Sequence, residues 1–204
     1  MTSNATIGSA AKERDGLSPK DFVFIAVFGI LLFLVFSIIF SANANLCWFT
    51  HTVGALFAGT VFMYLAYRVP KRGAIAIMGI IVGAVGLLMG MFWSGPVGIV
   101  VGGIVADLIA GDPQKRAKTK LVCAFAAFTF CFWLGQISLI LMMGEAYAEM
   151  CVQAGLTLEY GQALVNSILS PMGVVTGAAT IAGGLVGGFI GTKVFSKHFA
   201  KLGM

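Results

Sequence analysis

All Lys and Arg residues of the chain fall in four short clusters that are separated by long apolar runs. Two apolar runs lie between one cluster and the next, joined by a turn that contains no Lys or Arg. Membrane proteins keep their basic loops on the cytoplasmic side. The pattern therefore predicts six crossings, with both chain ends in the cytoplasm. The clusters are Lys12, Arg14 and Lys20; Arg68, Lys71 and Arg72; Lys115, Arg116, Lys118 and Lys120; and Lys193, Lys197 and Lys201.

The composition also indicates a membrane protein. The 204 residues are 59% hydrophobic and 10% charged, with a mean hydropathy of +0.97, whereas soluble domains carry about 25% charged residues. The net charge of +5 is compatible with a nucleic-acid partner, but the basic residues are expected along one membrane face, where anionic lipids attract them. We therefore expect a lipid-embedded chain and no nucleic-acid partner.

The apolar runs are continuous rather than alternating, which favours transmembrane helices over a β-barrel. A span needs about 20 apolar residues, so the short third and fourth runs are expected to lie at an angle or to share a re-entrant turn. We expect an all-α membrane protein, with a flexible cytoplasmic N-terminus over 1–18 and one six-helix domain over 19–204. The predicted spans are 22–41, 47–67, 74–91, 96–110, 121–143 and 171–195.

The segment 144–170 differs from the rest of the chain because it carries Glu145, Glu149 and Glu159 and no basic residue. It follows the fifth predicted span, on the external side. We interpret it as an external lid or an interfacial helix, with an unstructured loop as the alternative. Cys47 and Cys151 are both expected on this side, and whether they pair is left open.

Glycines recur four residues apart in several predicted spans, most clearly at Gly183, Gly187 and Gly191. This spacing places small residues on one helix face, where helix backbones approach closely. Two interpretations follow. In the first, the glycines pack the helices of this chain together, and the spacing alone favours this interpretation. In the second, they form a smooth surface that docks against a partner.

The sequence contains no recognisable catalytic constellation. Its two histidines, His51 and His198, are expected at opposite membrane faces. The stretch 187–193 resembles a phosphate-binding loop, but that loop requires adjacent Gly and Lys, and here Thr192 separates them. The four cysteines lack metal-site spacing. We therefore expect no enzyme activity and no intrinsic cofactor, and we expect any ATP hydrolysis to occur in partner subunits.

Polar and aromatic residues gather in the external half of the predicted bundle. Aromatic residues at this depth often belong to the interfacial belt, but Gln136 lies inside a span, where polar groups usually face a cavity. A few polar groups among many apolar ones are typical of a small-molecule site. We predict such a site beneath the segment 144–170. Its candidate residues are Asn45, Trp48, His51, Trp93, Gln136, Met143 and Tyr147.

Four stretches together resemble a known family over roughly residues 19 to 204. They are Val-Pro-Lys-Arg-Gly-Ala at 69–74, Gly-Gly-Ile-Val-Ala-Asp-Leu-Ile at 102–109, the Met-Met-Gly-Glu-Ala-Tyr within 141–148, and Gly-Gly-Leu-Val-Gly-Gly at 183–188, followed by Lys-His-Phe at 197–199. In order and spacing they are similar to the substrate-binding (S) components of energy-coupling factor (ECF) transporters, in particular the MptD or Trep_Strep group.

The resemblance implies the substrate-binding subunit of an ABC-type importer in the bacterial cytoplasmic membrane. It implies six helices, a ligand pocket on the external side, a transmembrane scaffold subunit and two ATPase subunits. Such S components often dock through an Ala-xxx-Ala face on the first helix. Here Ala26 is followed by Ile30, with Gly29 beside it. The expected docking residues are Ala26, Gly29, Gly183 and Gly187.

The resemblance leaves the substrate open between a vitamin and an iron-bearing or haem-type ligand. His51, Met142, Met143 and the aromatic residues would suit either one. Two other classes of function were weighed. A self-sufficient secondary transporter should show an internal repeat and intramembrane acids for ion coupling, and a membrane enzyme needs a convergent acid/base set. None of these features is visible in the sequence.

Overall fold

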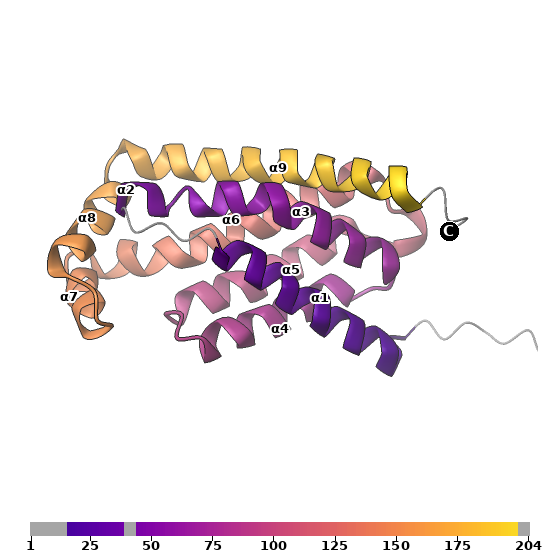
Figure 1. The fold of residues 1–204 in the computed structure, drawn as a ribbon, viewed down its shortest axis with the longest axis horizontal. Coiled ribbons are helices and arrows are strands. Elements are labelled where there is room, and N and C mark those ends of the chain that lie inside the picture. Colours follow the sequence, from indigo (N-terminus) through magenta and orange to yellow (C-terminus); the bar gives the residue numbers. More distant parts are fainter. Residues whose placement is uncertain (1–15, 39–43, 200–204) are drawn as a thin grey trace, which may run out of the picture.

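The computed structural model describes residues 16–38 and 44–199, apart from the side chains of 38, 44, 45, 198 and 199, and within these residues all regular structure is helical. Six longer helices form a bundle, and short helices gather at one end of it (Figure 1). The longer helices are α1 (Pro19–Ile38), α3 (Thr50–Arg68), α4 (Ala74–Leu88), α5 (Ser94–Ala110), α6 (Lys118–Met143) and α9 (Pro171–Phe199). The short helices at that end are α2 (Ala44–Cys47), α7 (Ala146–Gln153) and α8 (Leu158–Leu169), whereas the 3-10 turn η1 (Pro113–Lys115) joins α5 to α6.

Each predicted span coincides with one of the longer helices. Three helices, α1, α6 and α9, are long and apolar enough to cross a membrane, and α4 and α5 are shorter apolar helices. The all-helical fold is thus confirmed for the described residues. The number of crossings stays a prediction, as does the side on which the ends lie. The predicted flexible segment 1–18 falls largely outside the described residues.

Two serines that precede prolines begin the first and last helices of the bundle. At α1, the Ser18 backbone N–H donates to Asp21 Oδ2 (2.7 Å), and the Asp21 N–H donates to Ser18 Oγ (3.3 Å). This reciprocal pair satisfies N–H groups that have no partner inside the helix. At α9, Ser170 Oγ accepts from the Met172 N–H (3.2 Å). Each of these helices therefore has a proline as its first residue, directly after the capping serine.

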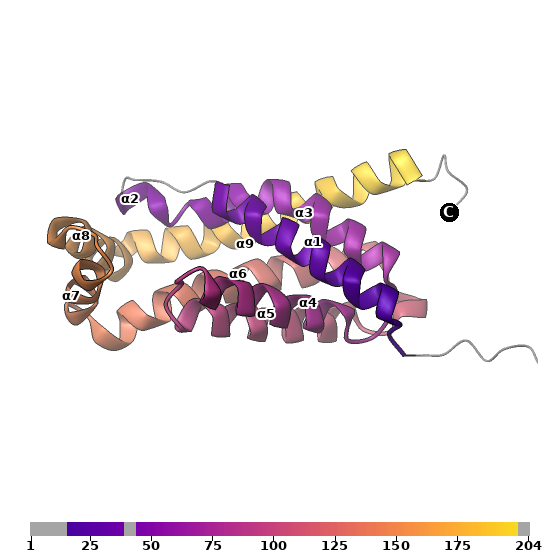
Figure 2. The same cartoon turned by 60° about the horizontal axis from the view of Figure 1, so that its bottom comes forward.

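The helices α4 and α5 form a hairpin that is shorter than the rest of the bundle. At 1.5 Å per residue, the 15 residues of α4 span about 22 Å, whereas the 26 residues of α6 span about 39 Å. Both views place the turn between α4 and α5 well short of the end formed by α7 and α8 (Figures 1 and 2). The short hairpin leaves space beside α1, α3 and α6 that side chains fill only in part.

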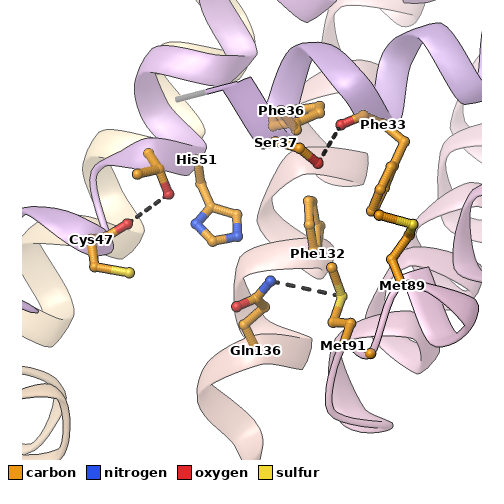
Figure 3. A pocket seen from close by; sticks show the side chains of 11 residues that line it. Phe33, Phe36, Ser37, Cys47, His51, Met89, Met91, Phe132 and Gln136 are labelled. Atoms are coloured by element: carbon orange, nitrogen blue, oxygen red, sulfur yellow. Dashed lines mark hydrogen bonds between the residues drawn. The ribbon is translucent and has the colours of Figure 1, made fainter. Parts of the chain in front are cut away.

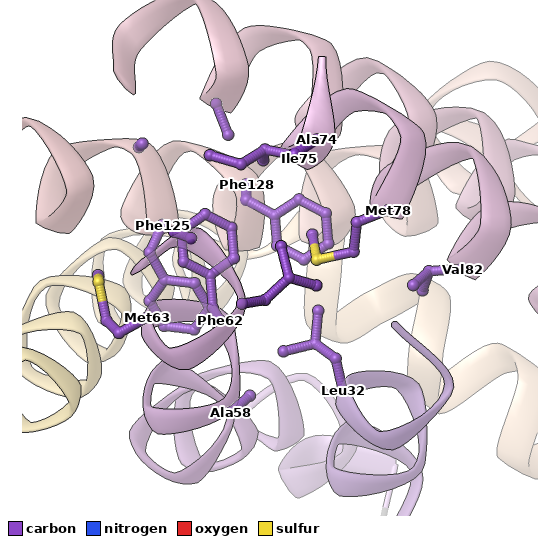
Figure 4. Close-up of a cluster of buried hydrophobic side chains, with 14 of the residues drawn as sticks. Leu32, Ala58, Phe62, Met63, Ala74, Ile75, Met78, Val82, Phe125 and Phe128 are labelled. Atoms are coloured by element: carbon purple, nitrogen blue, oxygen red, sulfur yellow. The ribbon is translucent and has the colours of Figure 1, made fainter. Parts of the chain in front are cut away.

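The main core lies where α1, α3, α4, α5 and α6 meet. Aromatic side chains fill its centre: the Phe62 ring centroid is 4.9 Å from that of Phe125 and 6.0 Å from that of Phe128. Leu32 of α1 and Met78 of α4 close it from the other side (Figure 4). These side chains are almost fully buried.

Three helix pairs meet backbone to backbone at facing glycines, which we call the glycine crossings: Gly79 with Gly103 between α4 and α5, Gly98 with Gly135 between α5 and α6, and Gly59 with Gly187 between α3 and α9. A Cβ atom added at Gly79 would lie 2.8 Å from Gly103 Cα, and one at Gly98 would lie 2.6 Å from Gly135 Cα. A Cβ atom at Gly59 would overlap the backbone of Gly187. Small residues permit this approach, so within the described chain the glycine stripes pack its own helices.

The expected docking residues lie mainly within these intrachain contacts. Gly183 and Gly187 are buried against α3, and Gly29 is buried against Val82 and Met78 of α4. Ala26 is half-buried. A partner subunit would reach the three glycines only if the helices of this chain moved apart. Docking through this face stays a prediction.

Basic and acidic side chains tie the helix ends together at the end of the bundle where α1 begins. Asp107, near the end of α5, accepts from the backbone N–H groups of Gly73 (3.0 Å) and Ile75 (3.3 Å), which open α4. Arg116 Nη2 lies 3.9 Å from Asp107 Oδ1 and donates to the Lys71 carbonyl (3.4 Å). We call this group the Asp107 network. Lys71 and Arg116 belong to different basic clusters, and the fold brings them to the same end.

Lys71 extends the Asp107 network to α1. Its Nζ lies 2.8 Å from Asp21 Oδ2 and 3.1 Å from the Gly16 carbonyl oxygen. The second basic cluster is therefore fastened to the start of α1 as well as to α4 and α5. This arrangement is the one expected if the basic clusters share one membrane face.

The predicted topology can be tested with single cysteines in a variant from which the native cysteines have been removed. We expect cysteines at Ser9 and Leu202 to react with a membrane-impermeant maleimide only from the cytoplasmic side. A cysteine at Gln153, which is exposed at the end of α7, should react only from outside. Labelling intact spheroplasts and inverted vesicles gives the readout. External labelling at Leu202 would rule out six crossings with both ends in the cytoplasm.

Candidate functional site

A cavity of about 400 Å³ lies between α1, α3 and α6, beside the turn that joins α4 to α5. The cavity lies toward the end of the bundle opposite the Asp107 network. Its walls come from the end of α1, the start of α3 and the later half of α6. A volume of this size suits a small molecule. Its lining residues are Phe33, Phe36, Ser37, Cys47, Thr50, His51, Met89, Gly90, Met91, Phe132 and Gln136 (Figure 3).

Two side chains in this cavity have hydrogen-bonding capacity that the described protein leaves unused. His51 is only 6% exposed, and its buried Nδ1 makes no well-aligned hydrogen bond among the described residues, although the ring interacts with the Trp48 backbone one turn earlier. Gln136 Nε2 donates to Met91 Sδ over 3.9 Å, and a thioether is a weak acceptor. Buried polar groups in proteins are nearly always hydrogen-bonded. An imidazole without a well-aligned hydrogen bond at Nδ1, beside a poorly paired amide, therefore indicates a place for a polar ligand group.

The two hydroxyl groups of the cavity are already engaged. Ser37 Oγ donates to the Phe33 carbonyl (2.9 Å), and Thr50 Oγ1 donates to the Cys47 carbonyl (2.6 Å). Their protons bond to backbone within or next to their own helices. His51 and Gln136 are therefore the side chains best placed to orient a ligand.

Aromatic rings form much of the remaining wall. Phe132 stands edge-on to the His51 ring, with centroids 4.8 Å apart at 74°, and edge-on to Phe36 at 5.6 Å and 81°. The Phe36 ring lies directly over Gly54, where a Cβ atom would come within 2.7 Å of it. Edge-on packing is a favourable arrangement of aromatic rings. The His51 side chain is thereby held in place by its neighbours.

The structure brings together two of the seven candidate residues, His51 and Gln136. Trp48 and Tyr147 are buried instead in a second apolar cluster with Trp133 and Leu164, and they do not line the cavity. Trp93 is 52% exposed and Met143 is also exposed, both outside the cavity lining. Asn45 lies in α2, but its side chain is outside the described part of the chain.

No pattern in the amino-acid sequence indicates the cavity walls formed by α1 and by the turn after α4. Phe33 and Phe36 looked like ordinary lipid-facing residues of an apolar span. Met89, Gly90 and Met91 line the cavity because the α4–α5 hairpin ends early, and hairpin length relative to α6 is a property of the assembled bundle. Phe132 could have been found, because it precedes Gln136 by four residues and so shares its helix face.

The segment 144–170 is structured, as expected for the lid interpretation, but none of its residues lines this cavity. It forms α7 and α8, whose Cys151, Leu164 and Ile168 pack into the second apolar cluster. Burial among these apolar groups raises the pKa of Tyr147 and of Tyr160, so both phenols stay protonated at neutral pH. The cavity therefore lies beside this segment and not directly beneath it, and a lid function stays a prediction.

The fold and cavity define a helical membrane protein with a small-molecule-sized site between its helices. Residues 19–201 match the family model for Trep_Strep, described as a hypothetical bacterial integral membrane protein family. The match covers most of the chain, so the chain belongs to the Trep_Strep family. No curated protein and no solved structure matches the chain.

Proposed function

We propose that this chain is the substrate-binding subunit of an ECF-type importer and that it captures a small molecule in the cavity between α1, α3 and α6. The observation that carries the proposal is the pair His51 and Gln136, which leave hydrogen-bonding capacity unused inside an otherwise apolar cavity. The resemblance of the four sequence stretches to S components supports the class of transporter. The proposal places the cavity toward the external face of the bacterial cytoplasmic membrane.

In this proposal the chain binds and other subunits supply energy. A transmembrane scaffold subunit and two ATPases would complete the transporter, and this chain would perform no chemistry on its ligand. A polar side chain in a membrane bundle usually faces a cavity or pathway and has a functional role. The four residues expected to dock the scaffold are Ala26, Gly29, Gly183 and Gly187.

Purification of the tagged chain from its native host tests the proposal directly. We expect a scaffold subunit and ATPases to co-purify with it, and we expect mass spectrometry to identify a bound small molecule. Uptake of that molecule should stop when the ATPases are disabled by mutation. Uptake by this chain alone, in vesicles without nucleotide, would instead identify a secondary transporter.

Substitution of the two polar residues should separate binding from assembly. We expect His51→Ala and Gln136→Ala each to weaken retention of the co-purified molecule about fivefold, the effect of losing about 1 kcal/mol of hydrogen bonding, while the other subunits still co-purify. Ser138→Ala, on the same helix as Gln136 but outside the cavity lining, serves as the control. Unchanged retention in both cavity variants would place the binding site elsewhere.

A further inference from the structure

The cavity that binds ligand in the proposed function has no charged wall. Among its described lining residues there is no Asp, Glu, Lys or Arg. The stretch 39–43, which joins α1 to α2, also contains none in its sequence, Ile-Phe-Ser-Ala-Asn. The acids of the segment 144–170, Glu145, Glu149 and Glu159, are exposed and outside the lining. A ligand carboxylate or phosphate inside the cavity would find no Lys or Arg among the described lining residues.

This absence of charge selects among ligands because burying an unpaired charge is costly. An isolated ion loses several kcal/mol or more on leaving water, and only an opposite charge or a dense set of hydrogen bonds offsets the loss. The cavity offers two polar side chains with free capacity, and the hydroxyls of Ser37 and Thr50 are committed to backbone carbonyls. With neutral His51, the described lining therefore favours a ligand whose enclosed part is uncharged.

The side chains of His51 and Gln136 also define which hydrogen-bonding groups the ligand should present to them. A neutral imidazole has one donor and one acceptor nitrogen, and an amide has an acceptor oxygen and donor hydrogens. His51 reaches the cavity from α3 and Gln136 from α6, and Figure 3 shows both on the same side of the space. A ligand edge that carries a donor next to an acceptor, as a cyclic amide does, satisfies both residues at once.

The rest of the cavity suits a flat ring. Phe33, Phe36 and Phe132 supply aromatic faces and edges, and Met89 and Met91 supply thioethers, which pack favourably against aromatic rings. Building on the proposed function, we infer that the cavity takes an uncharged, flat heteroaromatic molecule and holds its lactam-like edge between His51 and Gln136. This excludes ligands that would place a carboxylate or phosphate within the cavity.

A matched set of bicyclic probes tests this inference on the full-length chain in lipid nanodiscs. The probes are carbostyril (a neutral lactam), N-methylcarbostyril (which lacks the donor), quinaldate (a carboxylate on a similar ring) and naphthalene (which has no polar edge). Binding is measured by calorimetric titration, with empty nanodiscs subtracted to remove partition into lipid. We expect carbostyril to bind at least about tenfold more tightly than quinaldate, because only the carboxylate brings an unpaired charge.

Substitutions of His51 and Gln136 test whether these two residues cause the preference for carbostyril. We expect His51→Ala and Gln136→Ala each to weaken carbostyril about fivefold, as the loss of one neutral hydrogen bond would, and to reduce its advantage over naphthalene. Ser138→Ala is the control, because Ser138 lies on the same helix outside the cavity and its hydroxyl bonds to the Gly135 carbonyl. Gln136→Lys supplies a positive charge, so quinaldate should bind this variant more tightly than it binds the wild type.

Three results would overturn the inference: quinaldate binding as tightly as carbostyril, carbostyril binding no more tightly than naphthalene, or no carbostyril binding at all. The comparison of probes on the wild-type chain decides the question even if a variant fails to fold. The proposed function has a separate test in co-purification. If ATPases and a His51-dependent small molecule are recovered but quinaldate is not disfavoured, the inference fails and the proposed function stands.

Discussion

Replacing Gly187 with Leu is expected to abolish recovery of folded protein from the membrane. A Cβ atom at this position already overlaps the carbonyl group of Ala55 in α3, and Gly59 meets Gly187 from the same side. Relief would require α3 and α9 to separate along their length. Ordinary overpacking costs about 1–3 kcal/mol because side chains can shift. Here the added side chain would meet backbone atoms, which cannot shift as easily, so we expect a larger loss of folding free energy.

The experiment compares Gly187→Leu and Gly187→Ala with Val186→Leu, an exposed neighbour on the same helix. The monodisperse peak in size-exclusion chromatography should disappear for Leu, shrink for Ala and remain for the control. Wild-type behaviour of Gly187→Leu would show that α3 and α9 do not meet at this point. A folded Gly187→Ala that retains ligand but no longer assembles would instead support the docking role.

Removal of the Asp107 carboxylate is expected to be the second most damaging change. Asp107→Ala leaves the N–H groups of Gly73 and Ile75 without their acceptor, and it leaves Arg116, whose side chain is 5% exposed, without its nearest counter-charge. Breaking a buried ion pair by removing one partner typically costs 3–5 kcal/mol. We expect a loss of roughly 3 kcal/mol here, the low end of that range, because the ion pair is long, at 3.9 Å, and the Asp107 side chain is 16% exposed.

Asp112→Ala is the matched control for Asp107→Ala. Asp112 lies close by in sequence but is exposed, and its side chain accepts from the Gln114 N–H (3.0 Å) in the turn η1. Thermal unfolding in detergent should show a large decrease in melting temperature for Asp107→Ala and little change for Asp112→Ala. Equal effects of the two substitutions would mean that the Asp107 network does not hold α4 to α5.

The sequence predicted those parts of the fold that depend on local pattern. Apolar runs predicted the helices, because a run of apolar residues is a property of neighbouring positions. The glycine spacing indicated close helix contacts but not which helices meet. Gly59, in α3, meets α9 more than a hundred residues later, and no pattern within either helix identifies the other.

Only the polar residues of the candidate site could be predicted from the sequence. His51 and Gln136 stand out because polar side chains are rare within apolar spans. Trp48 was selected for the same region, but an aromatic residue near a membrane boundary suits an apolar cluster, a lipid interface or a ligand equally well. Its burial with Trp133 depends on how α2 and α8 fold back onto α6. Local sequence carries no signal for that arrangement.

The glycine crossings have a consequence for how this family tolerates mutation. At Gly79, Gly98 and Gly187 even a methyl group meets backbone atoms, whereas the cavity walls consist of side chains such as Phe36 and Met91, which can exchange for others of similar size. A saturation-mutagenesis map should therefore mark the crossings as the most restricted positions, although they touch no ligand. The cavity would stand out by contrast, as a patch where relatives are free to diverge in what they bind.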